Sequence, residues 1–390
     1  MNTIDQFNEH IMGTYGRYPI VLESGKDRCA VDESGKRYID FGSGIGTNSL
    51  GYCNEKWVEA VCEQVKKLQH TSNYYYTKVQ ADFSKKLSET TGMKKMFFGN
   101  SGAEANECAI KIARKYSFDK YGKGRHTIIT LVNSFHGRTL TTLSATGQDV
   151  FHNYFFPFTE GFHYVTANRI DELRDAIDDS VCAIMFEYIQ GEGGVVPLSK
   201  AFVDAIFQIA EEKDLLTIVD EVQTGVGRTG KFLAGDCFDK KADIVTLAKG
   251  IAGGLPMGVC LTGEKCAEVL TAGTHGSTFG GNPICCAGGL AVLEKAASPE
   301  FLEEVQKKAD HLRDRLLKID EVKSVSGIGL MVGIELKTKN AAEVVKKALD
   351  KGLLLLTAKT KVRLLPPLTI TIDEIDEGVK ILSELLSEPS

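Results

Sequence analysis

Two short apolar runs, each followed by a charged side chain, place the strongest constraint on the fold of this chain. The runs Leu215–Val219 and Ile244–Leu247 have the length and composition of buried strands. Asp220 follows the first run, and Lys249 stands two positions after the second. Ligands of an open α/β sheet bind outside the carboxyl ends of its strands, so we expect both side chains at one crevice.

A carboxylate and an amine in one crevice are typical of a pyridoxal phosphate (PLP) site. There the lysine forms a Schiff base with the cofactor, and the carboxylate contacts the pyridinium nitrogen. The ordinary alternative is that Asp220 caps a turn and Lys249 points into solvent. For these two residues taken alone, the ordinary alternative is favoured. The choice between the two interpretations therefore depends on motifs elsewhere in the chain.

The order of the predicted elements indicates an α/β fold. Strands alternate with helices over roughly residues 95–262, which predicts a mostly parallel sheet with crossover helices. The last hundred residues have the pattern of an α+β module with its own core. A chain of 390 residues is too long for one ordinary core and fits two domains, one of which has room to be split.

Composition excludes several classes of function. The formal net charge of -6 argues against a general binder of nucleic acid or anionic membranes. No apolar stretch is long enough to span a bilayer, and the first twenty residues do not resemble a signal peptide. The ten cysteines form no CxxC pair and indicate no metal site, so we expect free thiols in a reducing cytoplasm.

Two patterns resemble nucleotide-binding motifs and are rejected. Gly225, Gly227 and Gly230 form a GxGxxG, but no amphipathic helix begins at Gly230 as a dinucleotide site requires. The chain contains no GxxxxGK[ST], so the acidic strand end at Asp220 does not belong to a P-loop ATPase.

Two further loops follow predicted strands. Asn100 or Ser101 precedes a helix whose first N–H groups suit a phosphate, although an ordinary N-cap is the common alternative. In the next loop, Phe135 is suited to cover a flat ring and Arg138 to hold a carboxylate bidentately. We assign no proton-transfer role to His136, because a lone histidine is more often structural.

Three consecutive tyrosines, Tyr74–Tyr76, lie in a predicted loop between two helices. Their exposure would be costly, so they indicate an interface or a pocket wall. A subunit contact and a substrate contact are about equally supported.

Four motifs appear together in the order found in class III (ω-amino-acid) aminotransferases, and the chain resembles that family over nearly its whole length. They are Asn100–Glu107, Ser134–Thr139, Asp220–Gly225 with Lys249, and Gly276–Pro283. Within the family the sequence is most similar to acetylornithine aminotransferases, through Tyr15–Arg17, Gly44–Gly46 and His70–Tyr76.

The resemblance implies fold type I of the PLP-dependent transferases. We therefore expect a large α/β domain with a mostly parallel sheet flanked by helices, and a smaller α+β domain from both chain ends. The expected ranges are residues 51–283 for the large PLP-binding domain and residues 1–50 and 284–390 for the two parts of the small domain. A homodimer with active sites at the interface is also implied.

The resemblance also assigns the cofactor contacts. Lys249 is expected to carry PLP and to shuttle protons, and Asp220 to keep the ring nitrogen protonated. The remaining expected contacts are Gln223 to the ring 3-oxygen, Phe135 on the ring face, Ser101, Gly102 and Ala103 on the phosphate, and Thr278 on the phosphate of the neighbouring subunit's cofactor.

The substrate contacts follow in the same way. Arg138 is expected to hold the α-carboxylate of acetylornithine, and Arg363 that of 2-oxoglutarate or glutamate. Glu192 would pair with Arg363 while the amine donor is bound. Tyr15 and Ile45 are expected beside the substrate, and Ile45 stands where ornithine aminotransferases have a tyrosine.

The implied activity is transfer of an amino group from N-acetylornithine to 2-oxoglutarate in arginine biosynthesis, giving N-acetylglutamate 5-semialdehyde and glutamate. The alternatives within the family are enzymes acting on 4-aminobutyrate, ornithine, succinylornithine or succinyldiaminopimelate. A glutamate-semialdehyde aminomutase is disfavoured, because Arg363 and Glu192 imply an external keto acid. A cofactor-binding protein without turnover is disfavoured because all the expected catalytic and substrate residues are present.

Overall fold

The two apolar runs are neighbouring strands in the middle of a seven-stranded sheet. The computed structural model describes residues 2–388, and within them β10 (Leu216–Asp220) pairs in parallel with β11 (Ile244–Leu247), with Asp220 opposite Thr246. The strand order is β4-β12-β11-β10-β7-β5-β6. The other strands are β4 (Lys95–Gly99), β5 (Thr127–Leu131), β6 (Phe162–Val165), β7 (Val181–Phe186) and β12 (Gly258–Thr262).

The prediction of a mostly parallel sheet is confirmed. β7 pairs in parallel with β5 and β10, and β6 pairs in parallel with β5. β12 is the exception, because it runs antiparallel to both β11 and β4. Both β10 and β11 are buried along their whole length, as expected for strands covered on both faces.

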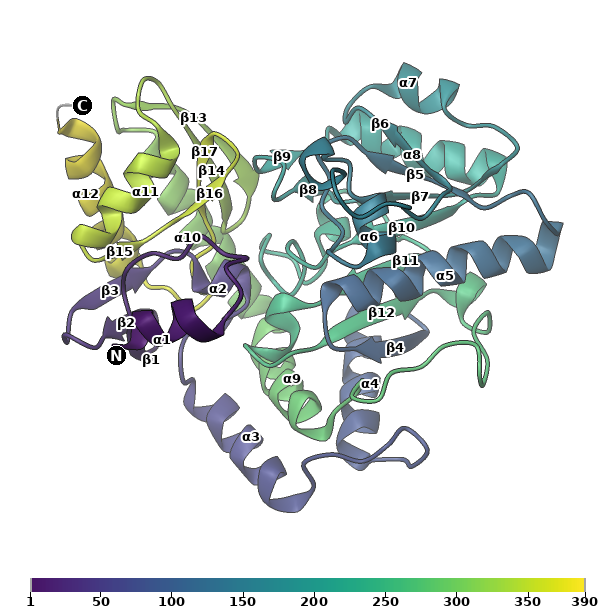
Figure 1. The fold of residues 1–390 in the computed structure, drawn as a ribbon, viewed down its shortest axis with the longest axis horizontal. Helices are drawn as coiled ribbons and strands as arrows, with labels where there is room; N and C mark the ends of the chain where they lie inside the picture. Colours follow the sequence, from purple (N-terminus) through teal and green to yellow (C-terminus); the bar gives the residue numbers. More distant parts are fainter. Residues whose placement is uncertain (1, 389–390) are drawn as a thin grey trace.

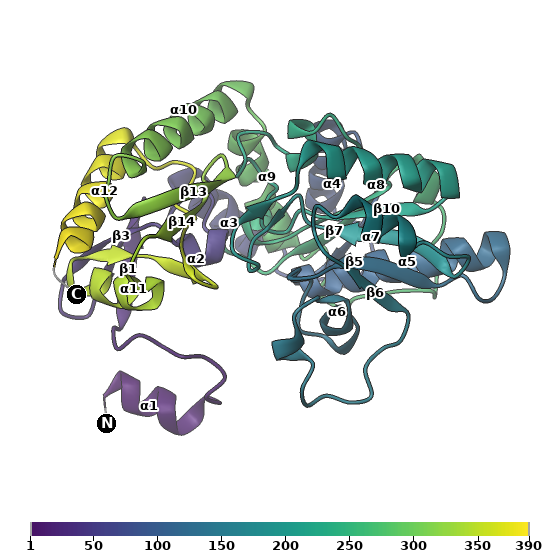
Figure 2. The same cartoon turned by 90° about the horizontal axis from the view of Figure 1, so that it is seen from above.

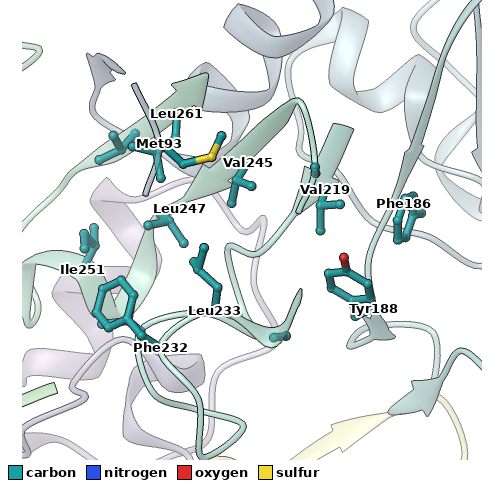
Figure 3. Close-up of a cluster of buried hydrophobic side chains, with 14 of the residues drawn as sticks. Met93, Phe186, Tyr188, Val219, Phe232, Leu233, Val245, Leu247, Ile251 and Leu261 are labelled. Atoms are coloured by element: carbon teal, nitrogen blue, oxygen red, sulfur yellow. The ribbon is translucent and has the colours of Figure 1, made fainter. Parts of the chain in front are cut away.

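Side chains of the central strands alternate between two cores, one on each face of the sheet. Val219, Val245 and Leu247 contribute to the first core, shown in Figure 3. Ile218 and Ile244, the alternate residues, contribute to the second. α8 (Lys200–Lys213) packs its apolar side chains into the first core, and α5 (Gly102–Tyr121) covers the second.

Shorter elements complete the larger lobe (Figure 1). They are α3 (Glu55–Lys67), α4 (Lys78–Thr91), α6 (Leu140–Ala145), α7 (Ile170–Asp175), α9 (Pro283–Ala296), the strands β8 (Ile189–Gln190) and β9 (Val196–Pro197), and the 3-10 turns η1 (Asp149–Phe151), η2 (Ala234–Cys237), η3 (Lys249–Ala252) and η4 (Glu264–Cys266).

The smaller lobe combines segments from both ends of the chain (Figure 1). Leu353 in β15 pairs in parallel with Ile39 in β3, which joins the C-terminal part to the N-terminal one. Its two sheets have the orders β1-β2-β3-β15 and β13-β14-β17-β16. The strands are β1 (Leu22–Lys26), β2 (Cys29–Asp32), β3 (Arg37–Asp40), β13 (Val322–Ile328), β14 (Met331–Leu336), β15 (Leu353–Leu354), β16 (Leu356–Ala358) and β17 (Lys361–Leu364).

Three helices cover these sheets and share one apolar core with them. They are α10 (Pro299–Leu316), α11 (Ala341–Asp350) and α12 (Ile372–Ser387). α12 begins at a capping box in which Thr371 accepts from the Glu374 N–H and Glu374 accepts from the Thr371 N–H. The single turn α2 (Ser43–Gly46) leads from this lobe toward the pocket described below.

The position of α9 bears on the expected domain boundary at residues 283/284. α9 packs against α3 and α4, and its Cys286, Val292 and Leu293 belong to the core of the larger lobe. α10 is the first element after it whose buried residues join the smaller lobe's core. We therefore propose that the C-terminal part of the small domain begins with α10, while the boundary near residue 50 is proposed as expected.

The N-terminal helix α1 (Thr3–His10) stands apart from both lobes, as Figure 2 shows. None of its residues is buried, and the chain stays exposed to residue 19. Apolar side chains such as Phe7, Met12 and Tyr15 therefore have no core to enter in a single chain. No helix within residues 2–388 combines the length and apolarity needed to cross a membrane.

Candidate active site

A cavity of about 690 Å³ opens where β10 and β11 end. Asp220 and Lys249 both line it, so the juxtaposition predicted from the two strand ends is present in the structure. The cavity also brings together seven other predicted site residues, which are Ser101, Gly102, Ala103, Phe135, Arg138, Glu192 and Gln223. Glu187, which is not predicted from the sequence as a site residue, lines it as well.

Lys249 is presented by a strained turn. It follows Ala248 directly after β11 and is the first residue of η3. Its φ of 45° is a left-handed backbone conformation that residues other than glycine rarely adopt. Such strain is often found at functional positions. Burial lowers the pKa of Lys249, and the nearby carboxylates of Asp220 and Glu192 act in the opposite direction. The amine is thereby brought closer to the neutral form that a base requires.

Asp220 is held by a buried hydrogen-bond network. Its Oδ2 accepts from Asn106 Nδ2 at 2.8 Å and lies 2.9 Å from His136 Nδ1, while Oδ1 accepts from the Val222 N–H at 3.0 Å. The amide oxygen of Asn106 accepts in turn from Thr246 Oγ1 at 2.7 Å. The carboxylate therefore has one orientation before any ligand arrives.

Neither His136 nor Asn106 is predicted from the sequence as a site residue. His136 is assigned there only a structural role, and the structure adds that its ring is buried against Asp220. Asn106 lies on the apolar side of α5 and is 1% exposed. A fully buried amide needs hydrogen-bond partners. The position of an asparagine among the apolar residues Ala105, Cys108 and Ala109 is therefore the sequence signal that could have identified Asn106.

Glu187, at the end of β7, connects two loops of the site. Its carboxylate accepts from the Phe135 N–H at 3.1 Å and from the Gly191 N–H at 3.2 Å. Burial, with Asp220 adding to it, raises the pKa of Glu187 to about 7. Glu187 thus fixes both the loop that carries Phe135 and the loop that carries Glu192.

The N-terminus of α5 forms one wall of the cavity. Ser101 is the N-cap and accepts from the Glu104 N–H at 3.2 Å. A Cβ atom on Gly102 would lie 2.9 Å from Val222 Cγ1, so glycine allows the close approach of the two loops. The first N–H groups of a helix have no intrahelical acceptor, and here they belong to residues that line the cavity. This wall suits an anionic phosphate.

Arg363 enters the cavity region from β17 of the smaller lobe. It is 3% exposed, and its Nη1 donates to Glu192 Oε1 at 2.5 Å and to Gln223 Oε1 at 3.3 Å. Glu192 and Gln223 belong to the larger lobe, so this cluster connects the lobes beside Lys249. The expected pairing of Arg363 with Glu192 is present in the structure.

Arg138, from the larger lobe, lines the pocket and is exposed. Its guanidinium carbon is 4.0 Å from the ring centroid of Phe151 and 5.6 Å from that of Phe135. The two arginines therefore approach the cavity from different lobes and in different settings, one buried and paired with a carboxylate, the other exposed and stacked on a ring.

Four predicted site residues do not line this cavity, and one of them is Arg363, which contacts the lining residues Glu192 and Gln223. Tyr15 and Thr278 are exposed, and Ile45 is 43% exposed with a φ of 61° in α2. Thr47, two residues after Ile45, does line the cavity. The role expected for Thr278 concerns the neighbouring subunit's cofactor, which is consistent with a position outside the chain's own pocket.

The family model that describes class-III aminotransferases matches residues 12–386. The chain belongs to the class-III aminotransferases. A member named acetylornithine aminotransferase in Haemophilus ducreyi is 51% identical over 392 residues, with 99% of this chain and all of that protein covered.

Solved structures of other class-III aminotransferases have the same fold. An N-acetylornithine aminotransferase from Stenotrophomonas maltophilia superimposes with a TM-score of 0.86 at 33% identity and covers 98% of each chain. An ornithine aminotransferase from Toxoplasma gondii, described as having partial occupancy of PLP at its active site, superimposes with a TM-score of 0.93 at 31% identity, covering 98% of this chain and 93% of that one. The expected family and fold type I are confirmed.

Proposed function

We propose that this class-III aminotransferase uses PLP to transfer the amino group of N-acetylornithine to 2-oxoglutarate. The observation that carries the proposal is the pair formed by buried Arg363 and half-buried Glu192 beside Lys249, with Arg138 lining the same pocket. The two arginines would provide two positions for carboxylates, and Glu192 would mask one of them reversibly. Full-length similarity to an acetylornithine aminotransferase supports the choice of donor.

The residues of the pocket fit PLP in each of its parts. The Asp220 carboxylate, oriented by Asn106 and His136, would hold the pyridine nitrogen in its protonated form. Phe135 would cover a ring face, and Gln223 would contact the 3-oxygen. The phosphate would bind at the N-terminus of α5, where Ser101, Gly102 and Ala103 line the cavity. Thr278 would reach the phosphate bound to the other subunit.

When bound, PLP supplies the electron sink that allows a carbon beside nitrogen to lose a proton. The protein contributes the base that takes this proton and returns it. Lys249 Nζ is that base in our proposal, because burial lowers its pKa and its strained turn places it in the cavity. Asp220 contributes a fixed negative charge that opposes loss of the ring proton.

The donor and the acceptor require different charges in one pocket. N-acetylornithine donates its distal amine, while its α-carboxylate would bind to Arg138. Glu192 then stays on Arg363 and hides that cation from the donor chain. For 2-oxoglutarate, Glu192 would move away and Arg363 would bind the α-carboxylate bidentately. Ile45 and Tyr15 would border the donor, with Ile45 leaving room for the acetylated end.

We further propose a homodimer located in the cytoplasm. Tyr74 and Tyr76 are 94% and 108% exposed, and α1 has no contact that buries any of its residues. Several exposed aromatic side chains close together are rarely left in solvent, so we favour a second copy of this chain that covers them. The ten cysteines are all free, which suits a reducing compartment.

The test is an absorbance experiment on the purified holoenzyme. We expect N-acetylornithine to bleach the visible band of the bound cofactor and 2-oxoglutarate to restore it, and Lys249→Ala to show neither change. Bleaching by ornithine, 4-aminobutyrate or a succinylated donor in preference to N-acetylornithine would refute the substrate assignment but not the class of reaction. A Lys249→Ala variant that transaminates normally would refute the mechanism.

A further inference from the structure

A second aromatic ring lies beside the pocket, and the proposed reaction does not yet use it. Phe151, the last residue of η1, has its ring centroid 4.0 Å from the guanidinium carbon of Arg138. The same ring meets Phe135 edge-on, with the centroids 6.1 Å apart and the planes at 75°. Phe151 is not among the residues that line the cavity, whereas Arg138 and Phe135 both are.

The position of Phe151 is fixed by the backbone around it. Its N–H donates to the Gln148 carbonyl at 3.0 Å, which closes the turn. The Gln148 side chain donates to the Ser134 carbonyl at 2.9 Å. This second hydrogen bond connects the turn to the loop that carries Phe135 and Arg138. The Phe151 ring and the Arg138 guanidinium are therefore held in place relative to each other.

Arg138 has little else to hold it. Within residues 2–388 its side chain forms no hydrogen bond and no ion pair, and it is exposed. A free arginine loses rotamer freedom when it binds a ligand, and that loss reduces affinity. A ring under the guanidinium restricts the side chain beforehand while its N–H groups in the plane remain available for a carboxylate.

We infer that Phe151 is a positioning residue that holds Arg138 for the carboxylate of the amine donor. The inference rests on the proposed role of Arg138. It predicts an effect only on substrates with a carboxylate that binds to Arg138, because Arg363 lies in the other lobe and is held by Glu192 and Gln223 instead. Phe151 would therefore raise the affinity for a donor that carries a carboxylate without changing the affinity for a donor that lacks one.

The chain supplies a matched control. Phe155 is four residues further along the same loop and is 54% exposed. Its ring contacts Tyr154, and no contact with Arg138 is present among the described residues. Phe155→Leu removes an aromatic ring of the same type from the same loop without touching the stack.

The experiment compares Phe151→Leu, Phe151→Tyr and Phe155→Leu as holoenzymes. For Phe151→Leu we expect the KM for N-acetylornithine to rise roughly 3- to 20-fold, the range expected from loss of a partly exposed cation–π contact. Phe151→Tyr keeps the ring face and should match the wild type, as should Phe155→Leu.

A donor without the carboxylate makes the test specific to Arg138. N-acetylputrescine is N-acetylornithine lacking that group, so its kcat/KM should be the same in the wild type and in Phe151→Leu. An equal loss for both donors would show a general structural effect and overturn the inference. An unchanged KM for N-acetylornithine in Phe151→Leu would overturn it as well.

Arg138→Leu separates this inference from the proposed function. If that variant loses donor affinity while Phe151→Leu does not, the assigned role of Arg138 stands and the positioning role of Phe151 fails. If Arg138→Leu leaves donor affinity unchanged, the proposed function of Arg138 itself is wrong.

Discussion

His136 Nδ1 lies 2.9 Å from Asp220 Oδ2, and both side chains are buried at the base of the pocket. The histidine comes from the loop after β5, whereas the aspartate ends β10, with β7 between them in the sheet. This contact joins the loop after β5 and the Asp220 carboxylate in one hydrogen-bond network. His136 Nε2 has no hydrogen-bond partner in residues 2–388, so Nδ1 makes the polar contact of the ring.

Replacing His136 by leucine should weaken the hold on Asp220. We expect kcat/KM to fall roughly 10- to 100-fold, the effect of removing a buried hydrogen bond to a charged group. The apparent Kd for PLP should rise in the same variant, as measured by absorbance titration. His136→Asn should recover part of the loss, because its amide can donate at a similar position.

A second histidine–carboxylate contact provides the control. His311 Nε2 lies 2.8 Å from Asp376 Oδ1 at the surface of the smaller lobe, far along the chain from the pocket. His311→Leu should leave kcat/KM and PLP binding unchanged. Equal losses in the two leucine variants would show that the effect of His136 is not specific to the site.

The Arg363–Glu192 pair should separate the two substrates. In Glu192→Gln the cation on Arg363 is no longer neutralised, so we expect the KM for N-acetylornithine to rise roughly 10-fold, as for loss of a charge-assisted contact. The KM for 2-oxoglutarate should fall or stay constant. Arg363→Leu should raise the KM for 2-oxoglutarate instead, and each half-reaction can be followed separately by single-turnover absorbance. A donor KM unaffected by Glu192→Gln would contradict the masking role.

Much of the site follows from the sequence because local patterns fix it. The runs that form β10 and β11 are buried strands, and parallel neighbours bring Asp220 and Lys249 to one edge. The helix α5 was predictable from its N-cap and periodicity, which placed Ser101 at the pocket. These features follow from two observations alone. One is the spacing of apolar residues along the chain, and the other is that ligands bind at the carboxyl ends of the strands in an open α/β sheet.

The part of the site that the sequence does not predict consists of contacts between residues far apart in the chain. Asn106 and Asp220 are separated by 114 positions, and His136 and Asp220 by 84. No local sequence pattern predicts which buried polar groups will contact each other, because those contacts depend on how α5 and the loops pack on the sheet. The contact of Phe151 with Arg138 is of the same kind, because a half-buried phenylalanine in a short turn has no period to mark it.

Glu221 should give the protein a measurable dependence of stability on pH. Burial raises its pKa from 4.5 to about 7, even though its oxygens accept from the Ala234 and Gly235 N–H groups. The folded state therefore holds this proton more tightly than the unfolded state. Its contribution to stability is present below about pH 4.5 and is lost as pH rises through about 7, by roughly 3 kcal/mol.

Glu221→Gln removes the ionisation and should flatten this dependence. Thermal melting between pH 5 and pH 8, at a fixed concentration of PLP, measures the slope of Tm against pH. We expect a shallower fall in Glu221→Gln than in the wild type, with Glu187 accounting for part of what remains. Glu303→Gln, at an exposed position of α10, should keep the wild-type slope. Identical slopes in all three proteins would show that Glu221 ionises at the same pH in both states.

Arg228 should couple the stability of the two lobes to the acceptor site. Its side chain is buried, and its Nη1 donates to the carbonyls of Leu330 and Pro366 at 3.2 and 2.5 Å. Both carbonyls belong to the smaller lobe, and Pro366 follows Arg363 by three residues. No carboxylate pairs with Arg228 within residues 2–388, and burial lowers its pKa to about 9.

Arg228→Met leaves two buried carbonyls without donors. We expect the free energy of unfolding to fall by roughly 2–4 kcal/mol, and the KM for 2-oxoglutarate to rise more than the KM for N-acetylornithine, because the strand that carries Arg363 loses its anchor. Urea unfolding and the two half-reactions provide the measurements. Arg174→Met, on the exposed side of α7, serves as the control and should change neither. Loss of stability with both KM values unchanged would show that Arg228 joins the lobes without positioning Arg363.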